Sequence, residues 1–238
     1  MKYQVKKYPN LEEEKLLWRK GIKVVVGLDE AGRGPLAGPV VAAAVVINPK
    51  HEIRNPKQIR IFKIQNSKHL SNFDIRISSL NIKDSKQLSQ KQREHLFKVL
   101  TRHPDVEWGI GIVSEKVIDK INILEASKLA MLKAVKDLGI APNYLLLDGN
   151  FKVYCATPQH AIIKGDQKVI SISAASIIAK VTRDRIMLKY DKKYPQYGFE
   201  KHKGYGTALH FKMLKKHGAC PIHRKTFYPV SDIRVIHN

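Results

Sequence analysis

Three short apolar runs that lead into aspartates constrain the fold of this chain more than any other feature. Each run has the length and composition of a strand, and the first does not alternate between polar and apolar residues, which predicts burial on both faces. A carboxylate at the mouth of a buried strand is costly unless a partner or a cation compensates its charge. The runs are residues 23–29, 144–148 and 161–164, and the aspartates are Asp29, Asp148 and Asp166, the last of which lies one glycine beyond its run.

The remaining patterns predict helices and two further strands. A capping-box pattern begins a helix at residues 89–92, and apolar residues at helical spacing predict one or two helices over 114–138, closed by Gly139. We therefore expect an α/β fold with a mixed five-stranded sheet flanked by helices. The other expected elements are strands over 40–47 and 107–113 and helices over 11–20 (with Asn10 as N-cap), 89–102, 172–190 and 207–217.

The charge balance points to a polyanionic partner. Lysine and arginine number 43 against 21 acidic residues, which gives a net charge of +22 with histidine neutral. Because neutralising phosphates releases condensed counterions, nucleic acid is the first partner to consider. Residues 1–10 lack an apolar run and residues 34–47 are too short and too broken to span a bilayer, so we expect no membrane contact. With only Cys155 and Cys220, a disulfide framework is not expected, and a reducing cytoplasm is the default location.

Asp29, Glu30, Asp148 and Asp166 together favour a site for divalent cations. One such acid alone is more simply a helix N-cap or half of an ion pair, but three strands that lead into acids favour a shared site. Clustered carboxylates repel one another unless cations lie between them, and oxygen ligands suit Mg²⁺ or Mn²⁺ rather than zinc. Two such ions can activate a water and stabilise the leaving oxygen of a phosphodiester. With the positive charge, this predicts metal-dependent hydrolysis of nucleic acid.

A series of motifs in a fixed order is similar to that of the ribonuclease HII family. The most specific is the opening signature DEAGRGPLAGPV at residues 29–40. The resemblance extends over residues 24–229 except for 48–83. It rests on the combination of motifs, which is more specific than any one of them. The other motifs are DSKQLS (84–89), LDG (147–149), KGD (164–166), AASIIAKVTRD (174–184), YPQYGF (194–199), KHKGY (201–205) and HR (223–224).

The resemblance implies a fold and an activity. The fold is a ribonuclease-H-like catalytic domain over residues 1–190, with a C-terminal helical extension over 191–238 that contributes to substrate binding. The implied enzyme cleaves the RNA strand of RNA–DNA hybrids and nicks 5′ to single ribonucleotides embedded in duplex DNA, leaving a 3′-hydroxyl and a 5′-phosphate. Its cofactors are two Mn²⁺ or Mg²⁺ ions, and we expect a monomer. The family's metal-binding acids match Asp29, Glu30, Asp148 and Asp166.

The same resemblance implies five substrate-binding residues. Gly32, Arg33 and Gly34 match the segment that senses the junction between ribose and deoxyribose. Tyr205 matches the tyrosine that packs on the sugar following the ribonucleotide, and Lys86 matches a phosphate contact. These residue types suit the roles, because glycines let backbone amides approach a 2′-hydroxyl and an aromatic ring among basic residues suits a sugar–phosphate track. The basic residues beside Tyr205 are Lys201, His202 and Lys203.

Plainer interpretations of single residues stay open. The Gly32–Gly34 segment serves equally well as a tight turn, and Tyr205 as an ordinary half-buried tyrosine. Asp184 is expected to pair with Lys180 or Arg183 and is left out of the site. The small residues 174–179 are assigned to close helix–sheet packing. A zinc site is set aside, because it lacks a fourth ligand at a usual spacing to join His217, Cys220 and His223.

Residues 48–83 form a basic stretch with no sustained period. Eight lysines and arginines meet two acidic residues here, a net charge of +6. The simpler interpretation is a solvated insertion loop, and the sharper one is an electrostatic clamp on the duplex backbone. The insertion also bears on how Lys86, just beyond it, is placed.

Two rival functions remain for the whole chain. A basic nucleic-acid-binding relative without catalysis is one, and the intact set of four acids argues against it. Ribonuclease HIII is the other, and we expect that enzyme to lack the Gly-Arg-Gly pattern and to carry a larger N-terminal domain.

Overall fold

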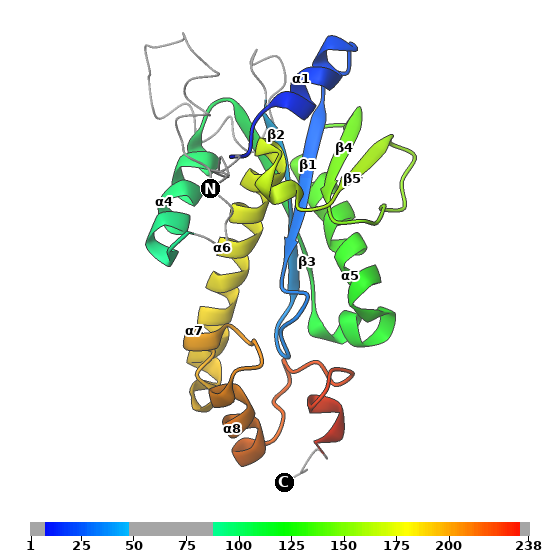
Figure 1. The fold of residues 1–238 in the computed structure, drawn as a ribbon. Coiled ribbons are helices and arrows are strands. Elements are labelled where there is room, and N and C mark those ends of the chain that lie inside the picture. The colour runs from blue at the N-terminus through cyan, green and yellow to red at the C-terminus, as the bar shows by residue number, and fades with distance from the viewer. Residues whose placement is uncertain (1–7, 48–87, 234–238) are drawn as a thin grey trace, which may run out of the picture.

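The computed structural model describes residues 8–47 and 88–233, which form a sheet with helices on both faces (Figure 1). The sheet has five strands in the order β3-β2-β1-β4-β5, with β1 antiparallel to β2 and parallel to β4. The predicted mixed five-stranded sheet is therefore confirmed. The strands are β1 (Val25–Ala31), β2 (Val40–Ile47), β3 (Val106–Val113), β4 (Tyr144–Asp148) and β5 (Gln159–Ile162).

Apolar side chains on the two faces of the sheet build two cores. Ala43 and Val45 of β2 join a core with α4 and α6, whereas Ala42 and Ala44 join a core with α5. Successive side chains of a strand point to opposite faces, so the unbroken apolar run of β2 supplies both cores. Figure 1 shows α4 and α6 on one side of the sheet and α5 on the other. The helices are α1 (Glu12–Arg19), α4 (Gln90–Arg102), α5 (Glu115–Leu138), α6 (Ile170–Lys193), α7 (Phe199–His202) and α8 (Ala208–His217), and the 3-10 turns are η2 (Gly165–Gln167), η3 (Pro195–Tyr197) and η4 (Val230–Asp232).

Small residues let the helices approach the sheet closely. A Cβ atom at Gly27 of β1 would lie 2.4 Å from the main-chain carbon of Ser171 on α6. Ala174, Ala175 and Ala179 of the same helix are fully buried against the sheet, which confirms the predicted packing role of these three residues. The close fit of α6 matters for function because this helix carries several residues toward the site.

Two strand boundaries differ from the predicted ones. β1 extends to Ala31 instead of ending at Asp29, because its pairing with β2 continues through Asp29 and Ala43 after its pairing with β4 ends at Leu28 and Leu147. β5 ends at Ile162, so Asp166 lies in the 3-10 turn η2 that follows and not one glycine beyond a strand. The acids thus sit where the β1–β4 ladder ends.

Most helix ends follow their local signals. The capping box at Ser89 is present, and Gly139 ends α5 in the left-handed conformation. α5 consists of two helical segments joined across Asn122, whose φ is 64°. The predicted N-cap Asn10 is wrong by one position, since Leu11 occupies the N-cap of α1, yet the Asn10 side chain accepts a hydrogen bond from the amide of Glu12 at 2.9 Å. Within the described residues, no helix is long and apolar enough to cross a membrane.

The chain after α6 folds back onto the connection between β1 and β2. The amide of Leu36 in this connection donates to the carbonyl of Gly204 at 2.8 Å, and Ala37 forms an antiparallel bridge with His223. Figure 1 shows α7 and α8 at the same end of the molecule as this connection. The C-terminal segment therefore shapes the surface beside the strand that carries Asp29.

Candidate active site

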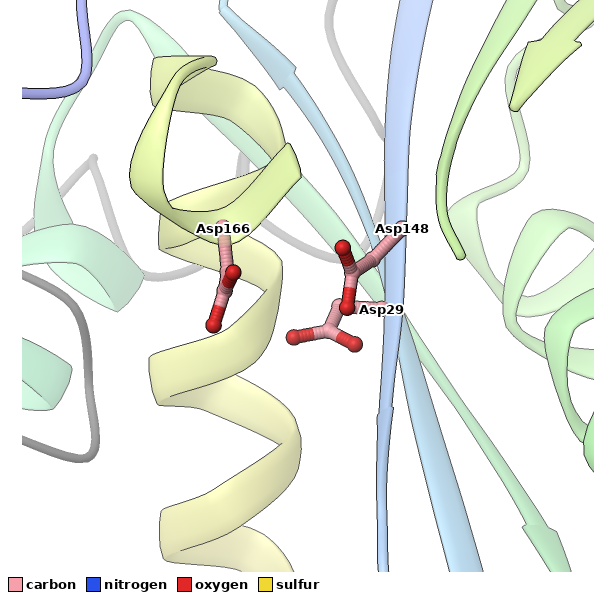
Figure 2. A group of neighbouring side chains, drawn as sticks. All are labelled: Asp29, Asp148 and Asp166. Atoms are coloured by element: carbon pink, nitrogen blue, oxygen red, sulfur yellow. The ribbon is translucent and has the colours of Figure 1, made fainter. Parts of the chain in front are cut away.

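Three aspartates from separate parts of the chain meet beside the sheet. Asp29 comes from β1, Asp148 from the end of β4 and Asp166 from the turn before α6. One carboxylate oxygen from each lies within 4.8 Å of the others. Figure 2 shows the three side chains grouped between β1 and the start of α6. The structure thus brings together three of the four acids that the sequence singled out.

The strands and one short turn hold these side chains in place. Because β1 and β4 run parallel, the carboxyl ends of their ladder share one edge, which sets Asp29 beside Asp148. Oδ1 of Asp148 accepts a hydrogen bond at 2.7 Å from the amide of Gly165, the residue before Asp166. A side chain at Gly165 would crowd this approach, because its Cβ would lie 2.7 Å from Cδ1 of Ile172. The terminal methyl of Ile172 would have to shift to admit a side chain at Gly165.

Burial and mutual repulsion disfavour the charged forms of these carboxylates. Burial raises the pKa of Asp29 well above its ordinary value, and the charges of Glu30 and Asp148 raise it further, while a hydrogen bond with Ser176 acts in the opposite direction. A divalent cation among these oxygens would compensate the repulsion, and carboxylate oxygens are the ligands that Mg²⁺ and Mn²⁺ prefer. The donor set therefore fits a hard divalent cation.

Glu30 lies next to this group but is not part of it. Glu30 follows Asp29 on β1, and both residues line the groove beside the acids. Its Oε1 pairs with Nη1 of Arg33 at 3.3 Å, and its Oε2 is buried with no hydrogen-bond donor among the described residues. Burial raises the pKa of Glu30 to about 7 against the opposing effect of Arg33. A buried carboxylate oxygen without a donor fits a cation, and the metal-ligand role of Glu30 stays a prediction.

A groove of about 340 Å³ joins the acids to the residues predicted to bind substrate. The turn after β1 and the Tyr205 ring both face this groove. The phenyl ring of Phe151 lies 5.6 Å from the guanidinium of Arg33, beside the groove. The lining residues are Asp29, Glu30, Ala31, Gly32, Arg33, Gly34, Asp148, Ser176, Lys180 and Tyr205.

The two glycines of the turn have different surroundings. Gly32 has a φ of 103°, and a Cβ there would lie 2.2 Å from Nε of Arg183, so the fold itself requires glycine. At Gly34 a Cβ would meet no atom within 4 Å among the described residues. The tight-turn interpretation accounts for Gly32 alone. Gly34 presents open backbone to the groove.

Tyr205 is 40% exposed and faces cations. Nζ of Lys180 lies 5.5 Å from the ring centre, and the guanidinium carbon of Arg183 lies 5.7 Å from it. The predicted pairing of Lys180 with Asp184 is confirmed, at 2.7 Å. The neighbour His202 is buried, and burial lowers its pKa, so the prediction that it adds to a basic track is wrong.

Buried imidazoles support the main chain of Tyr205. The amide of Cys220 donates to Nδ1 of His223 at 2.9 Å, Nε2 of His223 lies 3.0 Å from Nε2 of His210, and Nδ1 of His210 lies 2.9 Å from the carbonyl oxygen of Tyr205. The amide of Cys220 can only donate and the carbonyl of Tyr205 can only accept. His223 is therefore neutral with its proton on Nε2, and His210 is neutral with its proton on Nδ1. Burial lowers the pKa of both His210 and His223 to about 4.

Sequence reasoning missed four residues of this region. Ser176 and Lys180 line the groove, although the first had been assigned to packing and the second to an ion pair. Arg183 and Arg224 are fully buried beside the turn that contains Gly32. All four fall within motifs of the sequence, but burial and hydrogen-bond partners depend on which distant segments meet, and the motifs do not show that.

Two predictions lie outside the described residues. Lys86 and the basic stretch 48–83 both fall in the range 48–87, so their roles stay predictions.

Clustered carboxylates at the edge of a mixed sheet, beside an arginine, a lysine and a partly exposed tyrosine, are typical of a metal-dependent hydrolase of nucleic acid. Comparison with known proteins gives the particular family. The family model described as ribonuclease HII matches residues 26–77 and 72–230, and the chain belongs to this family. It is accordingly an endoribonuclease of the type 2 ribonuclease H class, a divalent-metal-dependent family with ribonuclease H activity on RNA–DNA hybrids.

Curated relatives agree over most of their length. The chain is 49% identical to ribonuclease HII of Endomicrobium trichonymphae over 217 residues, which is 91% of this chain and 90% of the relative. It is 46% identical to ribonuclease HII of Bacillus subtilis over 221 residues, which is 93% of this chain and 76% of the relative.

Solved structures share the fold. The ribonuclease H2 of Pyrococcus horikoshii OT3 matches with a TM-score of 0.63 at 31% identity, over 87% of this chain and 95% of that one. The ribonuclease HII of Archaeoglobus fulgidus, solved as a complex with PCNA, matches with a TM-score of 0.64 at 25% identity, over 86% and 95%. A ribonuclease HIII solved with Mn²⁺ matches with a TM-score of 0.62 at 16% identity, over 87% of this chain and 68% of that one. The predicted ribonuclease-H-like fold is confirmed.

Proposed function

We propose that this protein cleaves the RNA strand of RNA–DNA hybrids and also nicks 5′ to single ribonucleotides embedded in duplex DNA, leaving a 3′-hydroxyl and a 5′-phosphate. The observation that carries the proposal is one groove that holds both the carboxylates and the predicted recognition residues. A hydrolytic site and a site that distinguishes sugars must adjoin if cleavage is to fall at a ribonucleotide. Family membership supports the hybrid activity, and the layout of the groove supports the finer specificity.

The carboxylates are proposed to hold two divalent ions, Mg²⁺ or Mn²⁺. Asp29, Asp148 and Asp166 supply the clustered oxygens, and Glu30 supplies the buried Oε2 that has no donor within the described part of the chain. When bound, such ions activate a water for attack on the phosphodiester and stabilise the departing 3′-oxygen. The hydrogen bonds from the amides of Glu30 and Gly165 keep Asp29 and Asp148 oriented for this binding.

The turn after β1 is proposed to read the 2′-hydroxyl. Gly34 leaves its backbone open to the groove, so main-chain amide and carbonyl groups can reach a hydroxyl that only ribose offers. Arg33 is 46% exposed at its side chain and can turn from Glu30 to a substrate phosphate. Tyr205 offers a half-exposed ring on which the next sugar can pack.

The rest of the chain is proposed to extend the binding surface. Residues 1–190 serve as the catalytic domain, and residues 191–238 contribute to substrate binding through Tyr205 and the lysines near it. Lys86 is proposed to contact a phosphate, and the basic stretch 48–83 to act as an electrostatic clamp on the duplex backbone. The protein is proposed to be cytoplasmic and to act as a monomer. Sedimentation of the purified protein at several concentrations would test whether it is monomeric.

The deciding experiment is cleavage of a DNA duplex that carries one ribonucleotide. The native protein should cut 5′ to the ribonucleotide with Mg²⁺ or Mn²⁺ and not with chelator, and the Asp29→Asn variant should be nearly inactive. Glu13→Gln is the matched control, because it removes an exposed carboxylate on α1 outside the groove. Analysis of the ends should give a 3′-hydroxyl and a 5′-phosphate. Binding of the duplex without metal-dependent cutting would instead support a non-catalytic binding protein.

A further inference from the structure

Two fully buried arginines next to the groove take no part in the chemistry described so far. Arg183 lies on α6 and Arg224 in the C-terminal segment, and both have 0% exposure. Burying a guanidinium is costly unless its donors are satisfied. Within the described residues, every hydrogen bond from either guanidinium goes to a main-chain carbonyl oxygen. The acceptors therefore identify what each arginine holds in place.

Arg183 holds two separate turns at once. Its Nη2 donates to the carbonyl of Ala37 at 3.1 Å and its Nε to the carbonyl of Pro39 at 3.0 Å, both in the connection between β1 and β2. Its Nη1 donates to the carbonyl of Lys203 at 3.0 Å, two residues before Tyr205. A planar guanidinium makes these three bonds from three nitrogens, whereas a lysine ammonium is a single point of donation.

The connection between β1 and β2 also packs against Arg183. Any side chain at Gly32 would collide with the arginine, because a Cβ would lie 2.2 Å from its Nε. The guanidinium carbon lies 5.7 Å from the centre of the Tyr205 ring. One side chain thus touches both of the elements that the proposed function assigns to the substrate.

Arg224 fixes the same connection from its other side. Its Nη2, Nη1 and Nε donate to the carbonyls of Gly32 at 2.5 Å, Arg33 at 2.8 Å and Gly38 at 3.0 Å. Burial and then the nearby charge of Arg183 lower the pKa of Arg224 to about 9. In the described structure its hydrogen bonds reach this connection and not the turn of Tyr205. Arg183 alone of the two arginines bonds to both.

We infer that Arg183 is a positioning residue, which holds the Gly32–Gly34 turn and Tyr205 at a fixed spacing and thereby sets how strictly the enzyme prefers a ribose-to-deoxyribose junction over continuous RNA. The inference rests on the proposed function, which assigns the two elements to neighbouring sugars of one strand. Reading two neighbouring sugars requires the two contacts to keep their spacing. A displacement of about 1 Å can cost about a hundred-fold in rate.

The test compares two substrates across matched variants. The substrates are a DNA duplex with one ribonucleotide and an RNA–DNA hybrid with a continuous RNA strand. Arg183→Met removes all three bonds, and Arg183→Lys keeps the charge without the planar fork. Arg185→Met is the control, since Arg185 is on the same helix but pairs with Glu94 of α4 at 2.5 Å. Mn²⁺ binding is measured by calorimetry and folding by thermal unfolding.

In Arg183→Met the ratio of kcat/KM for the single-ribonucleotide duplex to that for the hybrid should fall at least ten-fold. Mn²⁺ affinity should stay within two-fold, because the acids are held by other residues. Arg183→Lys should lose selectivity in the same direction, since charge alone does not fix the spacing. In a Tyr205→Ala background, Arg183→Met should lower the ratio less than three-fold, because one of the two elements is already gone.

Several results would overturn the inference. Unchanged selectivity in a folded Arg183→Met or Arg183→Lys variant would do so, as would full additivity with Tyr205→Ala or an equal loss in Arg185→Met. Where Arg183→Met does not fold, the milder Arg183→Lys decides by the same ratio. A native protein that never cuts at a single ribonucleotide would overturn the proposed function, and the inference with it. A native protein that cuts selectively, with variants that cut equally selectively, overturns the inference alone.

Discussion

Two groups of buried polar side chains differ in whether the protein itself satisfies their charges and hydrogen bonds: the carboxylate cluster (Asp29, Glu30, Asp148 and Asp166) and the histidine cluster (His210 and His223). At the acids, burial and like charges raise the pKa of Asp29, and Oε2 of Glu30 has no donor among the described residues. At the histidines, each ring nitrogen in the chain from Cys220 to the carbonyl of Tyr205 has a partner. The carboxylates need a bound cation to compensate their charge, whereas the hydrogen bonds of the histidines are already satisfied by the protein.

This difference distinguishes a ligand-binding site from a network that only stabilises the local structure. A polar group left incomplete costs stability and persists where a ligand completes it, whereas a satisfied network makes the local structure rigid. We expect removal of an acid to cost activity and spare stability, and removal of a histidine to cost stability and spare the metal site.

The largest expected effect is that of Asp29→Asn on cleavage. Loss of one charged ligand should lower kcat/KM at least about a thousand-fold, which corresponds to about 4 kcal/mol. In chelator the same variant should be as stable as the native protein or more stable, because a buried repulsion is relieved. Steady-state cleavage and urea unfolding measure the two quantities. A variant that keeps its activity, or that unfolds much more easily without metal, would remove the contrast.

His210→Ala should produce the opposite pattern. It strands the Nε2 proton of His223 and the carbonyl of Tyr205 and leaves a cavity, so unfolding should become easier by roughly 3 kcal/mol. His217→Ala, at an exposed histidine, is the control and should stay within about 0.5 kcal/mol. Urea denaturation gives both values, and calorimetry should show unchanged Mn²⁺ affinity. A His210→Ala protein of native stability would contradict the supporting role.

The two clusters should affect the pH dependence of stability with opposite signs. The pKa of His210 and His223 is about 4 when folded against 6.5 when unfolded, so acidification through this window favours unfolding, by up to about 1.4 kcal/mol per pH unit for each ring. The pKa of Glu30 is about 7 when folded against 4.5 when unfolded, so stability from this group falls as pH rises through that window. In chelator, Glu30→Gln should therefore lose stability on acidification from pH 6.5 to 4.5 more steeply than the native protein. If urea unfolding gave the same dependence of stability on pH for Glu30→Gln and the native protein, Glu30 would not oppose the effect of the histidines.

The smallest expected effect on stability is that of Gly34→Ala. Its Cβ would enter open space, so unfolding should change by less than about 0.5 kcal/mol, while Gly32→Ala should destabilise by roughly 1–3 kcal/mol through strain and collision with Arg183. Despite its normal stability, Gly34→Ala should lower cleavage at a single ribonucleotide several-fold. Thermal unfolding and cleavage rates of the two variants compare these effects. Equal stability losses would place both glycines in the same structural role.

Much of the fold could be predicted because its signals are local. The continuous apolar run of β2 and the capping box at Ser89 depend on neighbouring residues, and both were predicted within one residue. The ends of β1 and β5 could not be predicted as well, because pairing with other strands decides where a strand stops. The extension of β1 past Asp29 comes from its partner β2 alone.

The site was predictable where a residue type has few other uses at its position. Acids that follow buried strands were found from the sequence, and three of them meet. Arg183 and Lys180 were missed, because an arginine or lysine on a helix usually points to solvent and its burial depends on segments far along the chain. The separate roles of Gly32 and Gly34 also needed coordinates, since both look alike within one turn.

The most direct measurement of the central claim is thermal unfolding of the native protein and of Asp148→Asn, each with chelator and with saturating Mn²⁺. A ligand that binds the folded state at a hundred times its Kd stabilises by about 2.7 kcal/mol, or about 5–10 °C in Tm for a chain of this size. We predict a shift of that order for the native protein and little or none for Asp148→Asn. Equal shifts for the two proteins, or no shift for the native one, would contradict the claim that these aspartates form a site completed by a divalent cation.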